Sequence, residues 1–150
     1  MSQKFKVVLM TNDTVRQVAD IEAECFTNPW SYDSFLSELS NPVSLTWVAM
    51  DGENNAAGFL NAYFVLDEAS LNNIAVREQY RRQGVGHQLL QTAFQHCRKN
   101  GVASFTLEVR QSNTAAISLY EKLGFRKTGE RKGFYSQPDE DAFLMTKRFQ

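Results

Sequence analysis

The segment from Leu71 to Leu90 constrains the fold of this chain more than any other. It begins with Leu71–Val76, which is typical of a strand end, and continues through a basic turn, Arg77–Gln83. Gly84-Val85-Gly86 then opens a pattern whose apolar residues recur at helical spacing. A helix start offers unpaired N–H groups and the positive end of a dipole, and glycines let an anion approach the backbone. The segment therefore predicts a strand, a phosphate-binding turn and a helix.

Two common phosphate-binding motifs do not fit this turn. A Walker A loop requires Lys and then Ser or Thr after its last glycine, but His87 and Gln88 follow Gly86. A dinucleotide fingerprint requires a third small residue where Leu89 stands, and an acidic residue at a strand end about 20 positions further on. Glu108 lies inside a strand pattern and fits that role poorly. An ordinary strand–helix turn without a ligand remains the alternative at this point.

The rest of the chain alternates between strand and helix patterns, without repeats or a linker. Strands are predicted at Phe5–Met10, Val43–Met50, Ala56–Leu66, up to Val76, Ala103–Arg110, Phe125–Tyr135 and Asp141–Phe149, and helices at Val15–Cys25, after Ser31, from Gly84 to Asn100 and from Asn113 to Gly124. The strand–helix–strand part around Gly84 should be parallel and the flanking hairpins antiparallel, with helices on both faces. We expect residues 1–150 to form one domain, with a bulge or bend at Asn72-Asn73.

Composition and charge indicate which kinds of binding partner and compartment to expect. A net charge of −1 gives no general attraction to nucleic acid, and no apolar run approaches the roughly 20 residues that cross a membrane. Cys25 and Cys97 fit no metal-binding spacing and are expected to be small buried residues. His87 and His96 are nine positions apart on one helix, so we expect surface or cap residues and no metal site. Free thiols without a signal peptide suggest the cytoplasm.

Several sequence blocks together resemble the GCN5-related N-acetyltransferase (GNAT) superfamily. Its pyrophosphate-binding signature is matched by Arg81-Arg82-Gln83-Gly84-Val85-Gly86. Further blocks stand in the family's order: Asn73-Ile74-Ala75-Val76, Leu107-Glu108-Val109-Arg110, Ser112-Asn113 and Leu119-Tyr120-Glu121-Lys122-Leu123-Gly124-Phe125. The resemblance implies a mixed, mostly antiparallel sheet of about seven strands, with helices on both faces and a splayed parallel strand pair. It also implies acetyl-coenzyme A (acetyl-CoA) as co-substrate, with no metal.

The resemblance assigns the donor-binding residues. Ile74, Ala75 and Val76 are expected to bind the cofactor arm through their backbone. The pyrophosphate is expected to meet the segment Arg82, Gln83, Gly84, Val85, Gly86 and His87, with further charge from Arg77 and Arg81. Asn113 is expected to be either a plain helix N-cap or a contact to the pantetheine arm.

Two residues are candidates for catalysis. Glu108 lies on the polar face of its strand and, by resemblance, is the general base, although spacing alone would favour a solvated carboxylate. Tyr120 is the candidate acid, because a phenol with a pKa near 10 stays protonated and can hydrogen-bond to a thiolate. Its place in an amphipathic helix also allows simple core packing.

The acceptor is suggested by three further blocks, Cys25–Ser31, Leu66–Leu71 and Leu107–Asn113, which resemble the RimI subgroup of the family. That subgroup acetylates the N-terminal alanine of a small-subunit ribosomal protein, by direct transfer in a ternary complex. The alternatives are a lysine or small amine as acceptor, or a non-catalytic CoA-binding domain. The expected acceptor walls are Phe26–Trp30, Tyr63 and Phe134-Tyr135, and a monomer without nucleic-acid or membrane partners is expected.

Overall fold

The elements of this computed structural model, which describes residues 4–149, follow the predicted order. They are β1 (Lys6–Leu9), α1 (Val15–Cys25), α2 (Tyr32–Glu38), β2 (Ser44–Met50), β3 (Ala56–Val65), β4 (Glu68–Val76), the 3₁₀ turn η1 (Glu78–Tyr80), α3 (Val85–Lys99), β5 (Ser104–Arg110), α4 (Thr114–Lys122), β6 (Arg126–Tyr135) and β7 (Glu140–Arg148). The predicted basic turn after β4 contains η1.

The seven strands form one sheet in the order β1-β2-β3-β4-β5-β7-β6. All neighbours pair antiparallel except β4 and β5, which pair parallel. The parallel pair arises because α3 crosses over between them, whereas short turns join the antiparallel neighbours β2–β3, β3–β4 and β6–β7. The predicted mixed, mostly antiparallel sheet is confirmed.

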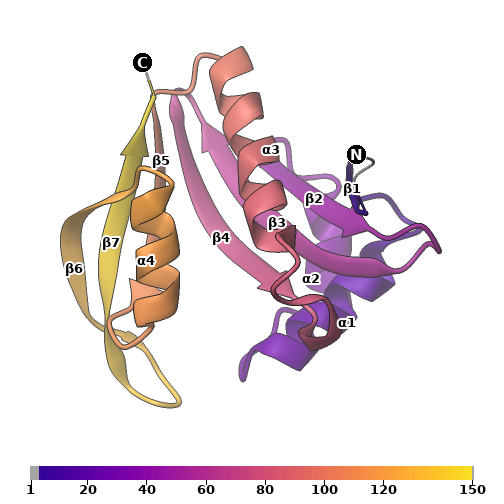
Figure 1. The fold of residues 1–150 in the computed structure, drawn as a ribbon, viewed down its shortest axis with the longest axis horizontal. Helices are drawn as coiled ribbons and strands as arrows, with labels where there is room; N and C mark the ends of the chain where they lie inside the picture. Colours follow the sequence, from indigo (N-terminus) through magenta and orange to yellow (C-terminus); the bar gives the residue numbers. More distant parts are fainter. Residues whose placement is uncertain (1–3, 150) are drawn as a thin grey trace.

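Helices cover both faces of this sheet, as predicted, with α3 on one side and α1 and α2 on the other (Figure 1). Successive residues of β3 face the two helix layers in turn, because side chains alternate between the faces of a strand. Phe59 packs with Ile21 and Phe35 of the α1–α2 layer, and Leu60 packs with Leu89 of α3. All of these side chains are fully buried.

The helix α2 buries less than its sequence predicted. Ser31 caps it as expected, accepting a hydrogen bond from the Ser34 N–H at 3.1 Å. The sequence also predicts that Phe35, Leu36 and Leu39 form an apolar stripe; Phe35 is buried, but Leu36 and Leu39 are 36% and 39% exposed, so the prediction is wrong for both leucines. With only seven residues, α2 presents one side chain to the core, and the rest of the stripe faces outward.

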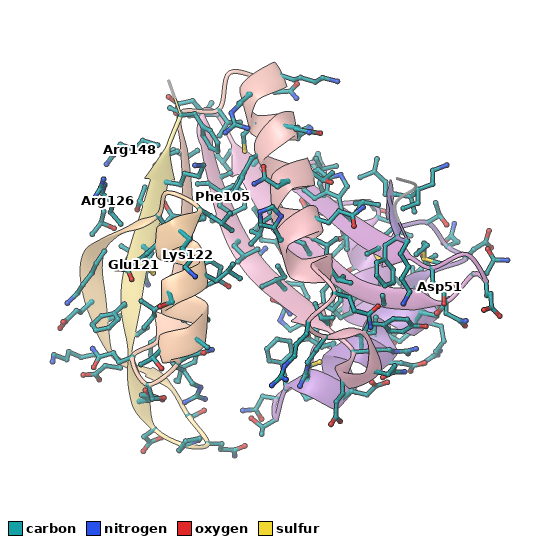
Figure 2. All side chains as sticks on the ribbon, in the orientation of Figure 1. Asp51, Phe105, Glu121, Lys122, Arg126 and Arg148 are labelled. Atoms are coloured by element: carbon teal, nitrogen blue, oxygen red, sulfur yellow. The ribbon has the colours of Figure 1, made fainter. Side chains whose placement is uncertain are left out.

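The strands β4 and β5 are splayed. They pair at only three positions, from Glu68↔Ser104 to Ser70↔Thr106, and then diverge (Figure 1). The ring of Phe105 fills the joint between β5 and α3, 5.8 Å from the ring centroid of Phe94 (Figure 2). Beyond the pair Ser70↔Thr106, β4 and β5 have no backbone ladder between them.

A bulge in β4 accompanies the splay. Asn61 of β3 pairs with Asn73, and Ala62 pairs with Leu71, so Asn72 is the extra residue. The Asn72 side chain donates to Asn61 Oδ1 at 2.9 Å, and Asn61 is itself fully buried. A bulge bends its strand and increases the local twist, so the predicted bulge is confirmed and helps to turn β4 away from β5.

Gly58 of β3 lets the start of α3 lie directly on the sheet. A Cβ atom at Gly58 would lie 2.6 Å from the Ala75 carbonyl oxygen and 3.1 Å from Cγ1 of Val85. Any side chain there would push apart β3, the end of β4 and the first residue of α3.

We expect Gly58→Ala to lower the free energy of unfolding by about 1–3 kcal/mol, the usual cost of overpacking a close contact. Urea denaturation followed by circular dichroism measures this change. Gly52→Ala is the matched control, because a Cβ at Gly52 meets nothing within 4 Å. Equal free energies of unfolding for the two variants would show that β4 and α3 can move away from a Cβ at position 58 without a loss of stability.

Candidate active site

The turn before α3 has the backbone conformation of an anion-binding loop. Arg82 and Gly84 both have positive φ, at 64° and 78°. The Gln88 N–H donates to the Gly84 carbonyl oxygen at 2.9 Å, which is the first bond of the helix. The N–H groups of residues 85–87 precede this bond and have no helical carbonyl to pair with. The turn therefore presents three backbone donors at the positive end of a 15-residue helix.

A hollow of about 230 Å³ lies against this turn, and we call it the turn hollow. It is lined by Val76, Tyr80, Arg81, Arg82, Gly84, Val85, Gly86, His87 and Leu119. Among the predicted pyrophosphate-binding residues, only Gln83 is not in its lining. The Gln83 side chain instead pairs with Lys4, which donates at 2.7 Å. Arg77 also lies outside, because its Nε faces the Glu24 carboxylate of α1 at 3.4 Å.

The backbone of β4 faces the splayed gap at alternate residues. The Arg77 N–H donates to the Ala57 carbonyl oxygen at 2.8 Å, which fixes the alternation of the β3–β4 ladder. Ile74 and Val76 consequently direct their backbone groups away from β3, toward the gap. Ala75 directs its groups toward β3, so the expectation of a backbone contact to the donor fits Ile74 and Val76 better than Ala75. The Val76 carbonyl oxygen already accepts from Arg81 Nε at 3.1 Å.

A larger cleft of about 570 Å³, which we call the main cleft, lies between the diverging strands. It is lined by Glu22, Phe26, Thr27, Asn28, Trp30, Leu71, Asn72, Asn73, Ile74, Glu108, Val109, Arg110, Asn113, Ala116, Tyr120, Phe134, Tyr135 and Ser136. The structure thus brings both catalytic candidates, Glu108 and Tyr120, into one cleft with Ile74 and Asn113. Of the expected acceptor walls, Tyr63 is absent. It pairs with Ser70, in the part of β4 that still pairs with β5, and its pKa is raised by burial and by Glu38.

Glu108 points out of the core on the polar face of β5. Its neighbours Leu107 and Val109 are buried on the other face, as the alternation predicted. Its side chain is 22% exposed, and its carboxylate lies 3.4 Å from Arg131 Nε. The Arg131 side chain is 56% exposed, so solvent screens this ion pair. The carboxylate is therefore accessible from the cleft and held only weakly by its partner.

Tyr120 packs in the hydrophobic core and also lines the main cleft. It is 8% exposed, and its ring packs edge-on against Phe125 at 5.5 Å between centroids. Burial raises the pKa of Tyr120 to about 12. A phenol with this pKa keeps its proton at any physiological pH and can act as a hydrogen-bond donor in the cleft.

Asn113 is the N-cap of α4. Its Oδ1 accepts a hydrogen bond from the Ala116 N–H at 3.2 Å, so the cap interpretation is confirmed. Asn113 also lines the main cleft, so the second expected role, a contact to the donor arm, remains a prediction.

Glu22 and Asn73 make a buried contact in the site that the sequence analysis did not predict. Glu22 is only 2% exposed, although it is charged, and the Asn73 side-chain amide donates to both of its carboxylate oxygens. The available signal was its position four residues after Val18, on the apolar face of α1. A carboxylate on the buried face of a helix needs polar partners in the interior.

His96 differs from the expected surface residue. Its ring packs against Phe64 at 4.9 Å and Trp47 at 5.6 Å, and burial lowers its pKa. Cys97 is fully buried, as expected. Within residues 4–149, no group of side chains is arranged to hold a metal ion, and no helix is long and apolar enough to span a bilayer.

Comparison with known proteins identifies the family to which this architecture belongs. An Escherichia coli (strain K12) protein named [Ribosomal protein bS18]-alanine N-acetyltransferase is 42% identical over 83% of this chain and 84% of its own. A Bacillus subtilis (strain 168) relative is 35% identical over 97% of this chain and 96% of its own. The crystal structure of the ribosomal-protein-S18-alanine N-acetyltransferase from Escherichia coli superposes with a TM-score of 0.88, at 36% identity, covering 96% of this chain and 93% of that one. Residues 15–125 match the model of the acetyltransferase (GNAT) family. With the glycine turn, the splayed strands and this match in agreement, the chain belongs to the acetyltransferase (GNAT) family.

Proposed function

We propose that this protein transfers an acetyl group from acetyl-CoA to the N-terminal α-amine of a ribosomal protein, the bS18 N-terminal alanine in particular. The observation that carries the proposal is the main cleft, in which Glu108 and Tyr120 meet the free backbone edge of β4. The name of the 42% identical Escherichia coli relative supports the choice of acceptor. The protein is proposed to act as a cytoplasmic monomer.

The chain's own residues fit a CoA donor. The turn hollow offers three helix-start N–H groups with Arg81 and Arg82 in its lining, a combination suited to a pyrophosphate. The backbone groups of Ile74 and Val76 face the gap between β4 and β5. An extended amide-containing arm can pair with such groups in the manner of an added strand. Asn113 lies across the cleft and adds a side-chain amide.

Each group in the cleft has a separate role in the proposed reaction. An α-amine has a pKa near 7.7–8.0, so a base must remove a proton before or during attack. Glu108 accepts that proton, directly or through water. A β4 backbone N–H facing the gap polarises the thioester carbonyl. Tyr120 donates its phenol proton, or a hydrogen bond, to the departing thiolate, which completes direct transfer in a ternary complex.

The test is an acetylation assay with acetyl-CoA and a panel of acceptors, read by mass spectrometry. We expect acetylation of a peptide with the bS18 N-terminal sequence at its α-amine. The same peptide with a blocked N-terminus, which offers only its side chains, should not react. Acetylation of internal lysines, polyamines or aminoglycosides with no reaction of the free N-terminus would replace the proposed acceptor. Binding of acetyl-CoA without turnover on any amine would indicate a non-catalytic CoA-binding domain.

A further inference from the structure

The acceptor side of the main cleft is formed by a segment without regular structure. Residues 26–31 connect α1 to α2, and Phe26, Thr27, Asn28 and Trp30 of this segment line the cleft. We call it the acceptor loop. Phe26 is 41% exposed, whereas Trp30 is anchored through its ring, against Phe35 at 5.3 Å. The position of such a loop depends on what holds its backbone.

Glu22 holds both ends of this loop. Its main-chain carbonyl oxygen accepts from the Phe26 N–H at 3.0 Å, where α1 ends. Its carboxylate Oε2 accepts from the Trp30 N–H, also at 3.0 Å, further along the loop. One residue of α1 therefore fixes where the loop leaves the helix and where it returns toward α2.

The same carboxylate connects the loop to the donor strand. Asn73 Nδ2 lies 2.7 Å from Oε1 and 2.8 Å from Oε2 of Glu22. Asn73 follows the bulge residue Asn72 and precedes Ile74, whose backbone faces the gap. The contact thus joins the acceptor loop to the strand at the point where β4 begins to splay.

The carboxylate has no cationic partner. Among the described residues, no ion pair includes Glu22, so its buried oxygens depend on the Trp30 and Asn73 donors. Burial raises the pKa of Glu22, while the Trp30 and Asn73 hydrogen bonds act in the opposite direction. A buried carboxylate held only by neutral donors is costly for stability, and such groups are found where a precise geometry is required.

We propose that Glu22 and Asn73 are positioning residues that set the distance between the acceptor loop and β4, and thereby determine how tightly the acceptor peptide binds. This inference rests on the proposed function for its kinetic readout. Neither side chain takes part in proton transfer. Their contact acts through the loop backbone, so it should affect the peptide and leave the acetyl-CoA site nearly unchanged.

An exchange of the two polar groups tests this proposal. In Asn73→Asp, two carboxylates face each other in the place of the donor–acceptor pair, and repulsion should displace the loop. We expect KM for the peptide to rise at least about tenfold, with KM for acetyl-CoA within about twofold. In the double variant Glu22→Gln with Asn73→Asp, the new amide at position 22 donates to the new carboxylate at position 73, while the amide oxygen still accepts from the Trp30 N–H. The peptide KM should then return to within about threefold of the wild-type value.

Controls separate this effect from charge and from folding. Glu22→Gln alone removes the charge but keeps an oxygen that accepts from the Trp30 N–H, so the peptide KM should rise less than in Asn73→Asp. Asp20→Asn removes one exposed charge from the same helix and should leave both KM values unchanged. A double variant as impaired as Asn73→Asp, or equal increases in both KM values, would overturn the proposal.

A second readout does not depend on activity. Hydrogen exchange at the Trp30 amide should accelerate in Asn73→Asp and slow again in the double variant, because that N–H is held by the side chain of residue 22. If the wild-type protein acetylated no peptide, the proposed function would fail while this measurement still tested the contact. Unchanged exchange in Asn73→Asp would overturn the proposal on its own.

Discussion

Replacing Glu108 with glutamine is expected to lower kcat by about 10²–10⁴-fold, the range that general-base catalysis contributes. Glutamine keeps the shape and one acceptor oxygen but cannot take a proton from the amine. Because Glu108 lies on the cleft wall and away from the turn hollow, the Kd for acetyl-CoA should change less than about twofold. Steady-state kinetics with the peptide gives kcat, and calorimetry gives the Kd.

The control for this change is Arg131→Gln. It removes the ion pair with Glu108 and leaves the carboxylate in place. Because that arginine is largely exposed, we expect less than about a threefold effect on kcat. If Glu108→Gln turned over as fast as the wild type, or no slower than Arg131→Gln, Glu108 would not be the base.

Replacing Tyr120 with phenylalanine is expected to lower kcat by about 10²-fold, with KM for both substrates nearly unchanged. Phenylalanine keeps the ring that packs against Phe125 and removes only the phenol donor. The free energy of unfolding should therefore change by less than about 1 kcal/mol, as thermal or urea denaturation can measure. Tyr135→Phe is the matched control, because Tyr135 also lines the cleft and also has its pKa raised to about 12, by burial and by Glu108. Equal losses in the two variants would mean that no single phenol is the acid.

The raised pKa of Tyr120 also predicts a pH dependence. The folded protein keeps this phenol proton up to about pH 12, whereas an unfolded chain loses it near pH 10. Between these values the unfolded state binds fewer protons, so this residue lowers the stability of the fold as pH rises from about 10 to about 12. Tyr120→Phe should remove that part of the alkaline loss in a denaturation series. An unchanged alkaline slope would contradict the assigned burial.

Local signals explain why most of the fold could be predicted from the sequence. The alternation of Phe105, Leu107 and Val109 identified both the strand β5 and the face on which Glu108 stands. The Asn72-Asn73 pair predicted the bulge, because two asparagines suit neither face of a half-buried strand. These features depend on neighbouring residues only, so a single sequence contains them.

What the sequence did not reveal depends on contacts between distant parts of the chain. The partner of the buried Glu22 carboxylate is Asn73, which is 51 positions away, and no residue near Glu22 in the sequence indicates that partner. Gly58 has an obligatory role only because Ala75 and Val85 approach it from β4 and α3. The two exposed leucines of α2 have helical apolar spacing, but the shortness of the helix leaves them outside the core. Periodicity shows which side of an element is apolar and not whether anything covers it.

The short ladder between β4 and β5 has a consequence for the lifetime of the protein. Three residue pairs and a shared aromatic core connect β1–β4 to β5–β7, so this junction is a natural place for partial opening below the cost of global unfolding. A donor molecule that bridges both strands stabilises the closed form according to its concentration relative to its Kd. Susceptibility to proteases should therefore fall as the acetyl-CoA supply rises.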